Sequence, residues 1–260
     1  MKRARARLTL AVAFVACLAP LLAWWLDARL PDAERMLWRA LALQMFWLGL
    51  ALSIARERGG ALHARLGLVR GQLGALQLAA SVCGTLALSG ALAFAVAEIG
   101  IPPRSSLGRL DAAASAAATE SPWLLLIAFG IAPGVCEELL FRGALQRSLE
   151  VWLGGWCVGV TALAFALVHL DPLHTPAALP LGLYLGALAW RARTTWLPIF
   201  CHVANNCAAA LPQLDPQLAS ALPQPASWPA AAGWLAICGL ALALFWRATP
   251  TPARHGSASG

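Results

Sequence analysis

Three ionisable side chains lie within one apolar stretch of this sequence. Glu137 and Glu138 follow the apolar run Trp123–Val135, and Arg142 comes four residues after Glu138. An ionised group within a membrane costs at least about 2.5–3.5 kcal/mol, so it usually has a partner and a function. A carboxylate in this setting could take a proton from water, which is the first step of a hydrolysis.

The two carboxylates are expected to have different roles. Glu138 and Arg142 share one helix face and can form a supporting ion pair along it. Glu137 is rotated by about 100° around the helix and would be left to face a cavity. A purely structural interpretation is also open, in which Arg142 and Arg147 each pair with one carboxylate.

Two later apolar segments carry histidines. Phe165 precedes His169 by one helical turn, and His202 precedes Asn206 in the same way. Either histidine alone could serve interhelical hydrogen bonding, which His and Asn provide in membrane bundles. Together with Glu137 they offer a base, a ring that can orient water, and donors for an oxyanion. The combination therefore indicates a hydrolytic site.

The elements that would position these residues are transmembrane helices. Of the 260 residues, 60% are hydrophobic and 12% are charged, whereas a soluble domain has about 25% charged residues. We therefore expect an all-α, polytopic membrane protein with about eight transmembrane helices in one bundle, each of about 20 apolar residues. The candidates are Leu8–Leu26, Met36–Ile54, Leu73–Ile99, Pro122–Leu145, Leu153–Leu170, Ala177–Trp190, Trp196–Leu211 and Ala230–Trp246.

Three parts are expected along the chain. Residues 1–120 would hold helices one to three and an external loop with a short surface helix. Residues 121–211 would hold the catalytic core with helices four to seven, and residues 212–260 a Pro-rich loop, the last helix and a disordered tail.

The net charge of +7 is explained by membrane topology. Lys and Arg concentrate in alternate loops, which is the positive-inside pattern with both termini cytoplasmic. The charge therefore indicates contact with a lipid bilayer, and we expect no nucleic acid partner. Arg greatly outnumbers Lys and Ala is abundant, which is typical of a GC-rich bacterial genome, so the expected location is the bacterial inner membrane.

The three motifs taken together resemble those of one known family. They are Glu137-Glu138-x-x-x-Arg142, Phe165-x-x-x-His169 and His202-x-x-x-Asn206, in this order on successive segments. They are similar to the motifs of the CPBP family, which contains the type II CAAX prenyl endopeptidases and their Abi-like bacterial relatives. The similarity runs from about Pro122 to Leu211 and includes Gly182–Gly186 (GLYLG).

The resemblance implies an intramembrane endopeptidase of eight helices. Carried over by motif position, Glu137 and His169 would activate the attacking water. His202 and Asn206 would form the oxyanion hole. Glu138 and Arg142 would support the geometry of the site.

The cofactor requirement stays open at this point. Relatives are described as metalloproteases or as glutamic-type proteases without metal. Glu137, His169 and His202 could supply three zinc ligands with an open fourth position. However, the sequence has no HExxH spacing, and a metal would occupy the groups that the other mechanism uses for acid–base chemistry. We therefore favour a site that requires no cofactor, with zinc as the alternative.

The expected substrate is a membrane-associated protein or peptide, such as one with a C-terminal sorting segment or a bacteriocin-like peptide. An alternative function is that of a non-catalytic membrane protein for bacteriocin immunity or scaffolding. A proton-coupled transporter is a third interpretation, and the lack of an inverted repeat counts against it.

One feature conflicts with a shared site. At about 1.5 Å per residue, Glu137 and His202 fall in the cytoplasmic half of their expected spans, and His169 falls near the opposite end of its own. Helix tilt, an overlong fourth helix or an extended fifth helix would remove the conflict. His174, in the following loop, is expected to be solvated.

Overall fold

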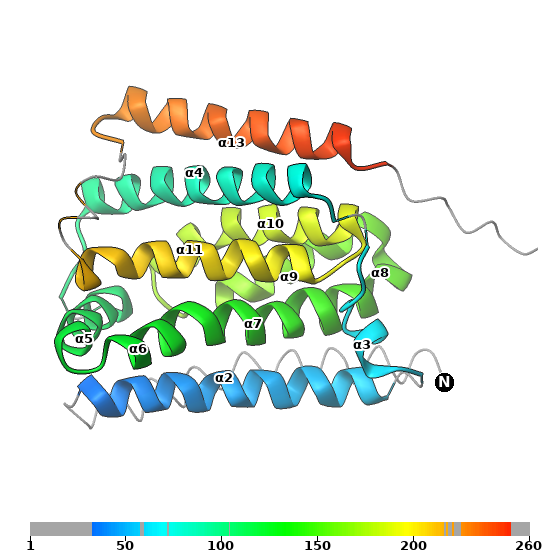
Figure 1. Ribbon diagram of the computed structural model, residues 1–260, viewed down its shortest axis with the longest axis horizontal. Helices are drawn as coiled ribbons and strands as arrows, with labels where there is room; N and C mark the ends of the chain where they lie inside the picture. Colours follow the sequence, from blue (N-terminus) through cyan, green and yellow to red (C-terminus); the bar gives the residue numbers. More distant parts are fainter. Residues whose placement is uncertain are drawn as a thin grey trace, which may run out of the picture.

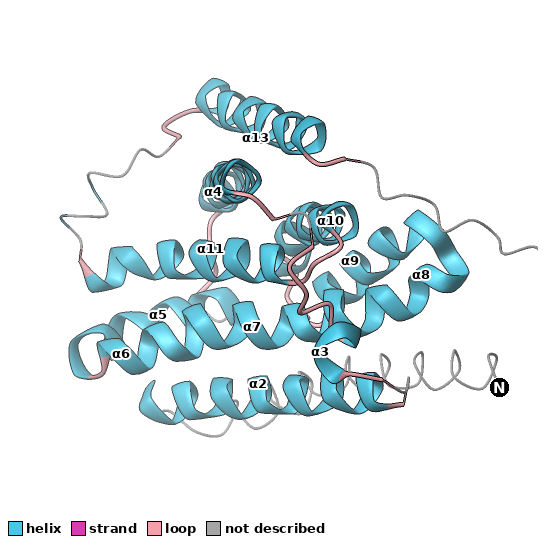
Figure 2. Cartoon of the chain, turned by 45° about the vertical axis from the view of Figure 1, so that its right-hand side comes forward, coloured by secondary structure: helices cyan, strands magenta, loops and turns pink. Residues whose placement is uncertain are grey.

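The computed structural model describes residues 33–57, 60–71, 73–103, 105–215, 217, 220 and 225–250. Every regular element within these ranges is a helix (Figure 2), which confirms the predicted all-α class. The expected first span, Leu8–Leu26, and the expected disordered tail from residue 251 lie outside the described residues.

The segment with the paired carboxylates is one long helix with two widened turns. It consists of α6 (Pro122–Leu125), the π-helical η1 (Leu126–Ile131), α7 (Ala132–Glu138), the π-helical η2 (Leu139–Gln146) and α8 (Arg147–Leu153). Pro133 lacks an N–H group, and its ring would clash with the carbonyl group one turn earlier in a regular α-helix. The wide turn of η1 lies directly before it. π-Helical turns are frequent at functional sites, and here they flank Glu137 and Glu138.

Five further long helices complete the bundle. They are α2 (Ala33–Arg56), α4 (Ala75–Ile99), α10 (His174–Ala192), α11 (Trp196–Leu214) and α13 (Trp228–Ala248). α13 packs on α4, α4 on α11 and α11 on α7, and α2 packs on the other side of α7 (Figure 1). The segment expected to be external holds α5 (Ser106–Glu120), which packs on α2 and α11, and the connection after α2 holds α3 (Leu62–Arg65).

The expected fifth span, Leu153–Leu170, is wrong in length. The chain turns at Gly154, which has φ +52°, passes through η3 (Gly154–Trp156) and continues as α9 (Cys157–Leu167). Eleven helical residues cover about 16 Å, whereas the hydrocarbon core of a bilayer is about 30 Å thick. Asp171 Oδ1 then accepts hydrogen bonds of 2.9 Å from the N–H groups of Leu173 and His174, where α10 begins.

This turn removes the conflict in depth. The loop expected after Leu145 is instead helical through α8, so the overlong fourth helix is the correct explanation. Glu137 lies 17 residues before Gly154, and His169 lies 15 residues after it (154 − 137 and 169 − 154). At about 1.5 Å per residue, both side chains therefore reach a similar depth in the bundle.

Four helical segments among the described residues are long and apolar enough to cross a membrane. They are Met36–Arg56, Ala75–Ile99, Pro122–Leu167 and Trp228–Ala248. The expected sixth and seventh segments do form helices, α10 and α11, but they are not among these four. Both pack inside the bundle, and α11 carries His202 and two asparagines, which lower its hydropathy. The part of the chain that the structure describes is therefore all-helical with four such segments, and the number eight stays a prediction.

Several helix ends, including the arginine-bearing end of α10, lie together at one end of the bundle. Arg191 Nη2 donates to the carbonyl of Thr249 at 2.6 Å, and Arg193 pairs with Glu150 at the end of α8. The N–H group of Thr195 donates to Gly67 at 2.9 Å, which ties the connection after α2 to the same end. This grouping is what the positive-inside pattern requires, and the cytoplasmic orientation stays a prediction.

Candidate active site

Close helix contact brings the first and third motifs together. A Cβ atom on Gly134 of α7 would lie 2.7 Å from the backbone nitrogen of Val203 on α11, closer than real Cβ contacts allow. Only glycine therefore permits this approach, as small residues do at membrane helix interfaces. Gly134 precedes Glu138 by one turn, and Val203 follows His202 directly, so the same contact sets Glu138 against His202.

One oxygen of Glu138 joins two of the predicted residues. Its Oε1 accepts a 2.6 Å hydrogen bond from Arg142 Nη1 and a 2.8 Å bond from His202 Nδ1. Glu138 is 0% exposed, Arg142 1% and His202 4%. The predicted pair between Glu138 and Arg142 is therefore present and fully buried, and it extends to His202.

The bond to Glu138 sets the tautomer of His202. A carboxylate oxygen can only accept, so Nδ1 carries the proton and Nε2 is left for the site. Neutral imidazole then presents a lone pair at Nε2, and the doubly protonated ring presents an N–H donor there. Glu138 thus holds the His202 ring in one tautomer and orientation, as a buried carboxylate does in hydrolytic triads.

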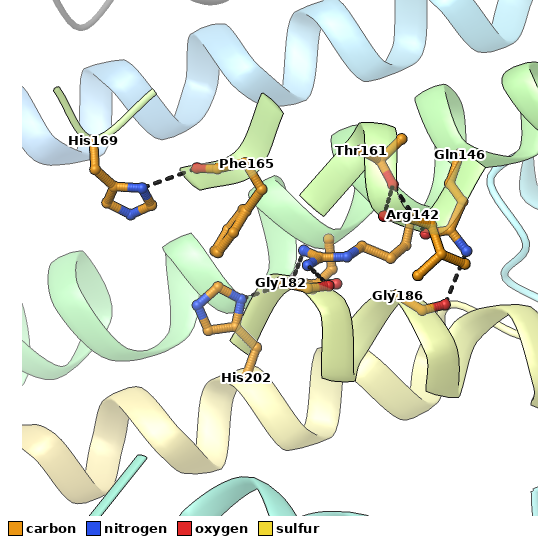
Figure 3. A network of polar contacts seen from close by, with 10 residues as sticks. Arg142, Gln146, Thr161, Phe165, His169, Gly182, Gly186 and His202 are labelled. Atoms are coloured by element: carbon orange, nitrogen blue, oxygen red, sulfur yellow. Dashed lines mark hydrogen bonds and ion pairs between the residues drawn. The ribbon is translucent and has the colours of Figure 1, made fainter. Parts of the chain in front are cut away.

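Arg142 is held by the GLYLG segment of α10. Its Nη2 donates to the carbonyl of Gly182 at 3.0 Å, and Gln146 Nε2, one turn later, donates to Gly186 at 2.9 Å (Figure 3). These two bonds tie η2 to α10 and leave the guanidinium little freedom beside Glu138. Gln146 also accepts a 3.3 Å hydrogen bond from Thr161 Oγ1 of α9.

The ring of Phe165 lies between the two histidines. Its centroid is 5.2 Å from that of His169 and 5.8 Å from that of His202, and Arg142 lies over it at 4.6 Å. Phe165 is 1% exposed and also packs edge-on against Phe141. One residue from each of the three motifs, His169, Arg142 and His202, therefore contacts the ring of Phe165 (Figure 3).

His169, like His202, has Nδ1 bound within the protein and Nε2 left over. Its Nδ1 donates to the carbonyl of Phe165 at 2.9 Å, so in the neutral ring Nε2 is an acceptor. Burial lowers the pKa of His169 to about 4 and that of His174 to about 3. His174, expected in a loop, instead begins α10, where it is half-buried and its ring lies 4.0 Å from the ring of His169.

Glu137 is bound by a residue that sequence reasoning missed. Its Oε1 accepts a 3.0 Å hydrogen bond from Nε2 of Gln44 on α2. Glu137 is partly exposed whereas Glu138 is fully buried. The signal in the sequence was a single amide in an otherwise apolar stretch, which in a membrane helix usually marks a packing or functional contact.

Asn206 lies one turn after His202 on α11. Its Oδ1 accepts a 3.1 Å hydrogen bond from Nδ2 of Asn205, which leaves the NH₂ group of Asn206 as a donor. Together, the site residues supply a partly exposed carboxylate, two imidazoles and an amide donor.

Zinc stays the alternative to a site without a cofactor, and the side chains that could hold it are not gathered into a preformed group. Among the described residues, which include Glu137, His169 and His202, no three His, Cys, Asp or Glu side chains form a group that could hold a metal ion. His202 Nδ1 is bound to Glu138 and His169 Nδ1 to a carbonyl, so Nε2 is the nitrogen that each neutral ring could offer to a water molecule or to a metal ion.

Two comparisons with known proteins give a match. Residues 119–208 match the family model described as "Type II CAAX prenyl endopeptidase Rce1-like". A Bacillus subtilis (strain 168) protein named "Putative membrane peptidase YdiL" is 29% identical over 97 residues. This stretch is 36% of the present chain and 38% of the relative, so the chain matches less than half of that protein's length. No solved structure matches significantly.

The matched segment contains all three motifs, from Glu137 to Asn206, whereas Gln44 lies outside it. The resemblance predicted from these motifs is therefore confirmed over this segment: residues 119–208 are similar to the Rce1-like type II CAAX prenyl endopeptidases, and both comparisons support a membrane protease of the CPBP family.

Proposed function

We propose that the chain is an intramembrane endopeptidase that hydrolyses a peptide bond of a membrane-associated protein or peptide. The observation that carries the proposal is the division between the two carboxylates. Glu138 binds Arg142 and His202, whereas Glu137 binds a neutral amide and is partly exposed. A carboxylate that is not neutralised by a bonded cation is free to act as a base.

In this mechanism Glu137 takes a proton from water while the water oxygen attacks the carbonyl carbon of the substrate. The lone pair of His169 Nε2 orients the water. The negative charge that develops on the carbonyl oxygen is stabilised by donors from His202 and Asn206. The C–N bond then breaks, the proton passes to the leaving amine, and a carboxylate and an amine are released.

His202 can donate from Nε2 only when its ring carries two protons, because Nδ1–H is bound to Glu138. Glu138 accepts the hydrogen bond from Nδ1 of His202, and Arg142 pairs with the same carboxylate oxygen and holds it in place. Both are therefore positioning residues for His202. No metal is required in this proposal.

The test uses protein reconstituted in liposomes with a library of peptides that carry apolar C-terminal segments. Product ends are mapped by mass spectrometry for the wild type, Glu137→Gln, His169→Ala and His202→Ala. The wild type should cleave, and each variant should lose about 10²- to 10⁴-fold in rate, as for the loss of an acid–base group. Undiminished cleavage in all three folded variants would overturn the proposal.

The location and the substrate are also proposals. The gathered arginine residues favour a bacterial inner membrane with both termini cytoplasmic. C-terminal sorting segments and bacteriocin-like peptides are the substrate classes that the library should include.

A further inference from the structure

We infer that Gln44 is a positioning residue for Glu137, supplied by a helix outside the segment that the family match covers. The inference rests on the proposed function, because it assigns Gln44 to the base of that reaction. The supporting contacts lie on the side of α2 that packs against the bundle.

The buried face of α2 is apolar except at Gln44. Leu37, Trp47 and Ala51 are each no more than 2% exposed and recur at helical spacing on this face. Gln44 lies on the same face and is 5% exposed. A buried amide on such a stripe is unfavourable unless it is hydrogen-bonded, so its partner identifies its role.

That partner is the carboxylate of Glu137. The amide donates from Nε2 to Oε1 at 3.0 Å, and Oε1 of Gln44 is buried without a hydrogen-bond partner among the described residues. Among the described residues, Gln44 thus makes its side-chain hydrogen bond with Glu137. It leaves Oε2 of Glu137 to receive the proton of a water molecule.

Two consequences follow from this geometry. First, the base is fixed between two helices, because α7 carries the carboxylate and α2 holds one of its oxygens. Second, a hydrogen bond donated to a carboxylate favours its ionised form over its protonated form. Loss of the amide should therefore raise the pH at which Glu137 becomes ionised, and the reaction would need a higher pH.

The chain offers a closely matched control in Gln213. Its Nε2 also donates to a carboxylate, Asp111 Oδ1 at 2.9 Å, and its Oε1 is also buried without a described partner. This second amide–carboxylate bond joins α11 to α5 and contacts none of the site residues. Gln44→Met and Gln213→Met therefore remove the same bond type at two places.

The experiment measures kcat, KM and the pH profile of peptide cleavage for the wild type and both variants in liposomes. Gln44→Met should lower kcat about 10- to 100-fold, as expected for a hydrogen bond to a charged group. KM should stay unchanged, and the acidic limb of the profile should move up by about one pH unit. Gln213→Met should leave kcat and the profile unchanged. Wild-type kcat and profile in Gln44→Met would overturn the inference.

A second readout does not depend on turnover. The infrared carbonyl band of protonated Glu137, identified by its loss in Glu137→Gln, should appear at higher pH in Gln44→Met than in the wild type. An identical titration would refute the role of Gln44 even if no substrate is cleaved. Full cleavage by Glu137→Gln would instead refute the proposed function. If Gln44→Met does not fold, Gln44→Asn, which is one methylene shorter, should show the same shift.

Discussion

Replacing Glu138 by Gln should destabilise the protein far more than the same change at Glu137. Glu138 and Arg142 are both buried, and the guanidinium depends on this carboxylate for its counter-charge. Glu138→Gln would leave a buried cation unpaired, which costs about 3–5 kcal/mol. It would also weaken the 2.8 Å hydrogen bond that orients His202.

The matched change at Glu137 has a smaller expected effect on stability. Glu137 is partly exposed and accepts one bond, from Gln44. The amide oxygen of a glutamine at position 137 can still accept that bond, so the loss should be at most about 0.5–1.5 kcal/mol, the net value of a hydrogen bond. Both variants should be inactive, for different reasons.

Reversible unfolding in detergent micelles, followed by circular dichroism, measures the difference. The free energies of unfolding of the two variants should differ by at least about 1.5 kcal/mol. Equal losses of stability would show that the two carboxylates are wrongly divided into support and base.

Three further predictions concern packing, pH and metal. Gly134→Ala should destabilise the protein by about 1–3 kcal/mol and lower its activity. Gly233→Ala should do neither, because nothing lies within 4 Å of an added Cβ at that position. Thermal unfolding of both variants measures the difference. Because the pKa of His169 is lowered to about 4 by burial, the unfolded chain binds more protons between about pH 4 and 6.5, so stability should fall as the pH falls through this range. His169→Gln should flatten that part of the stability curve, and an unchanged curve would contradict the assignment. Treatment with a strong chelator should leave cleavage and unfolding unchanged, and elemental analysis should find less than one zinc per chain. Activity that is lost to the chelator and restored by added zinc would contradict the metal-free proposal.

Local patterns were enough to predict most helices and the ion pair. The spacing of Glu138 and Arg142 places them on one face in any helix, and the bonded pair confirms this. Apolar runs likewise predicted α2, α4 and α13 to within a few residues. The family also followed from three motifs, each of which uses only one or two helical turns.

Features that depend on tertiary context were missed. The polar residues around Arg147 and Glu150 read as a loop, yet packing against η2 and α9 continues the helix there as α8. The length of α8 in turn sets the depth of His169 in the bundle. Counting residues along each expected span separately could not predict this depth. Gln44 was missed because its partner, Glu137, lies 93 residues away in the sequence, so no local pattern links the two. The link between Glu138 and His202, 64 residues apart, was missed for the same reason.

The most direct test of the central claim is the cleavage rate of Glu137→Gln in liposomes, measured beside its unfolding free energy. The account predicts a loss of at least about 10²-fold in kcat with stability within about 1.5 kcal/mol of the wild type. A fully active, folded Glu137→Gln variant would show that Glu137 is not the base.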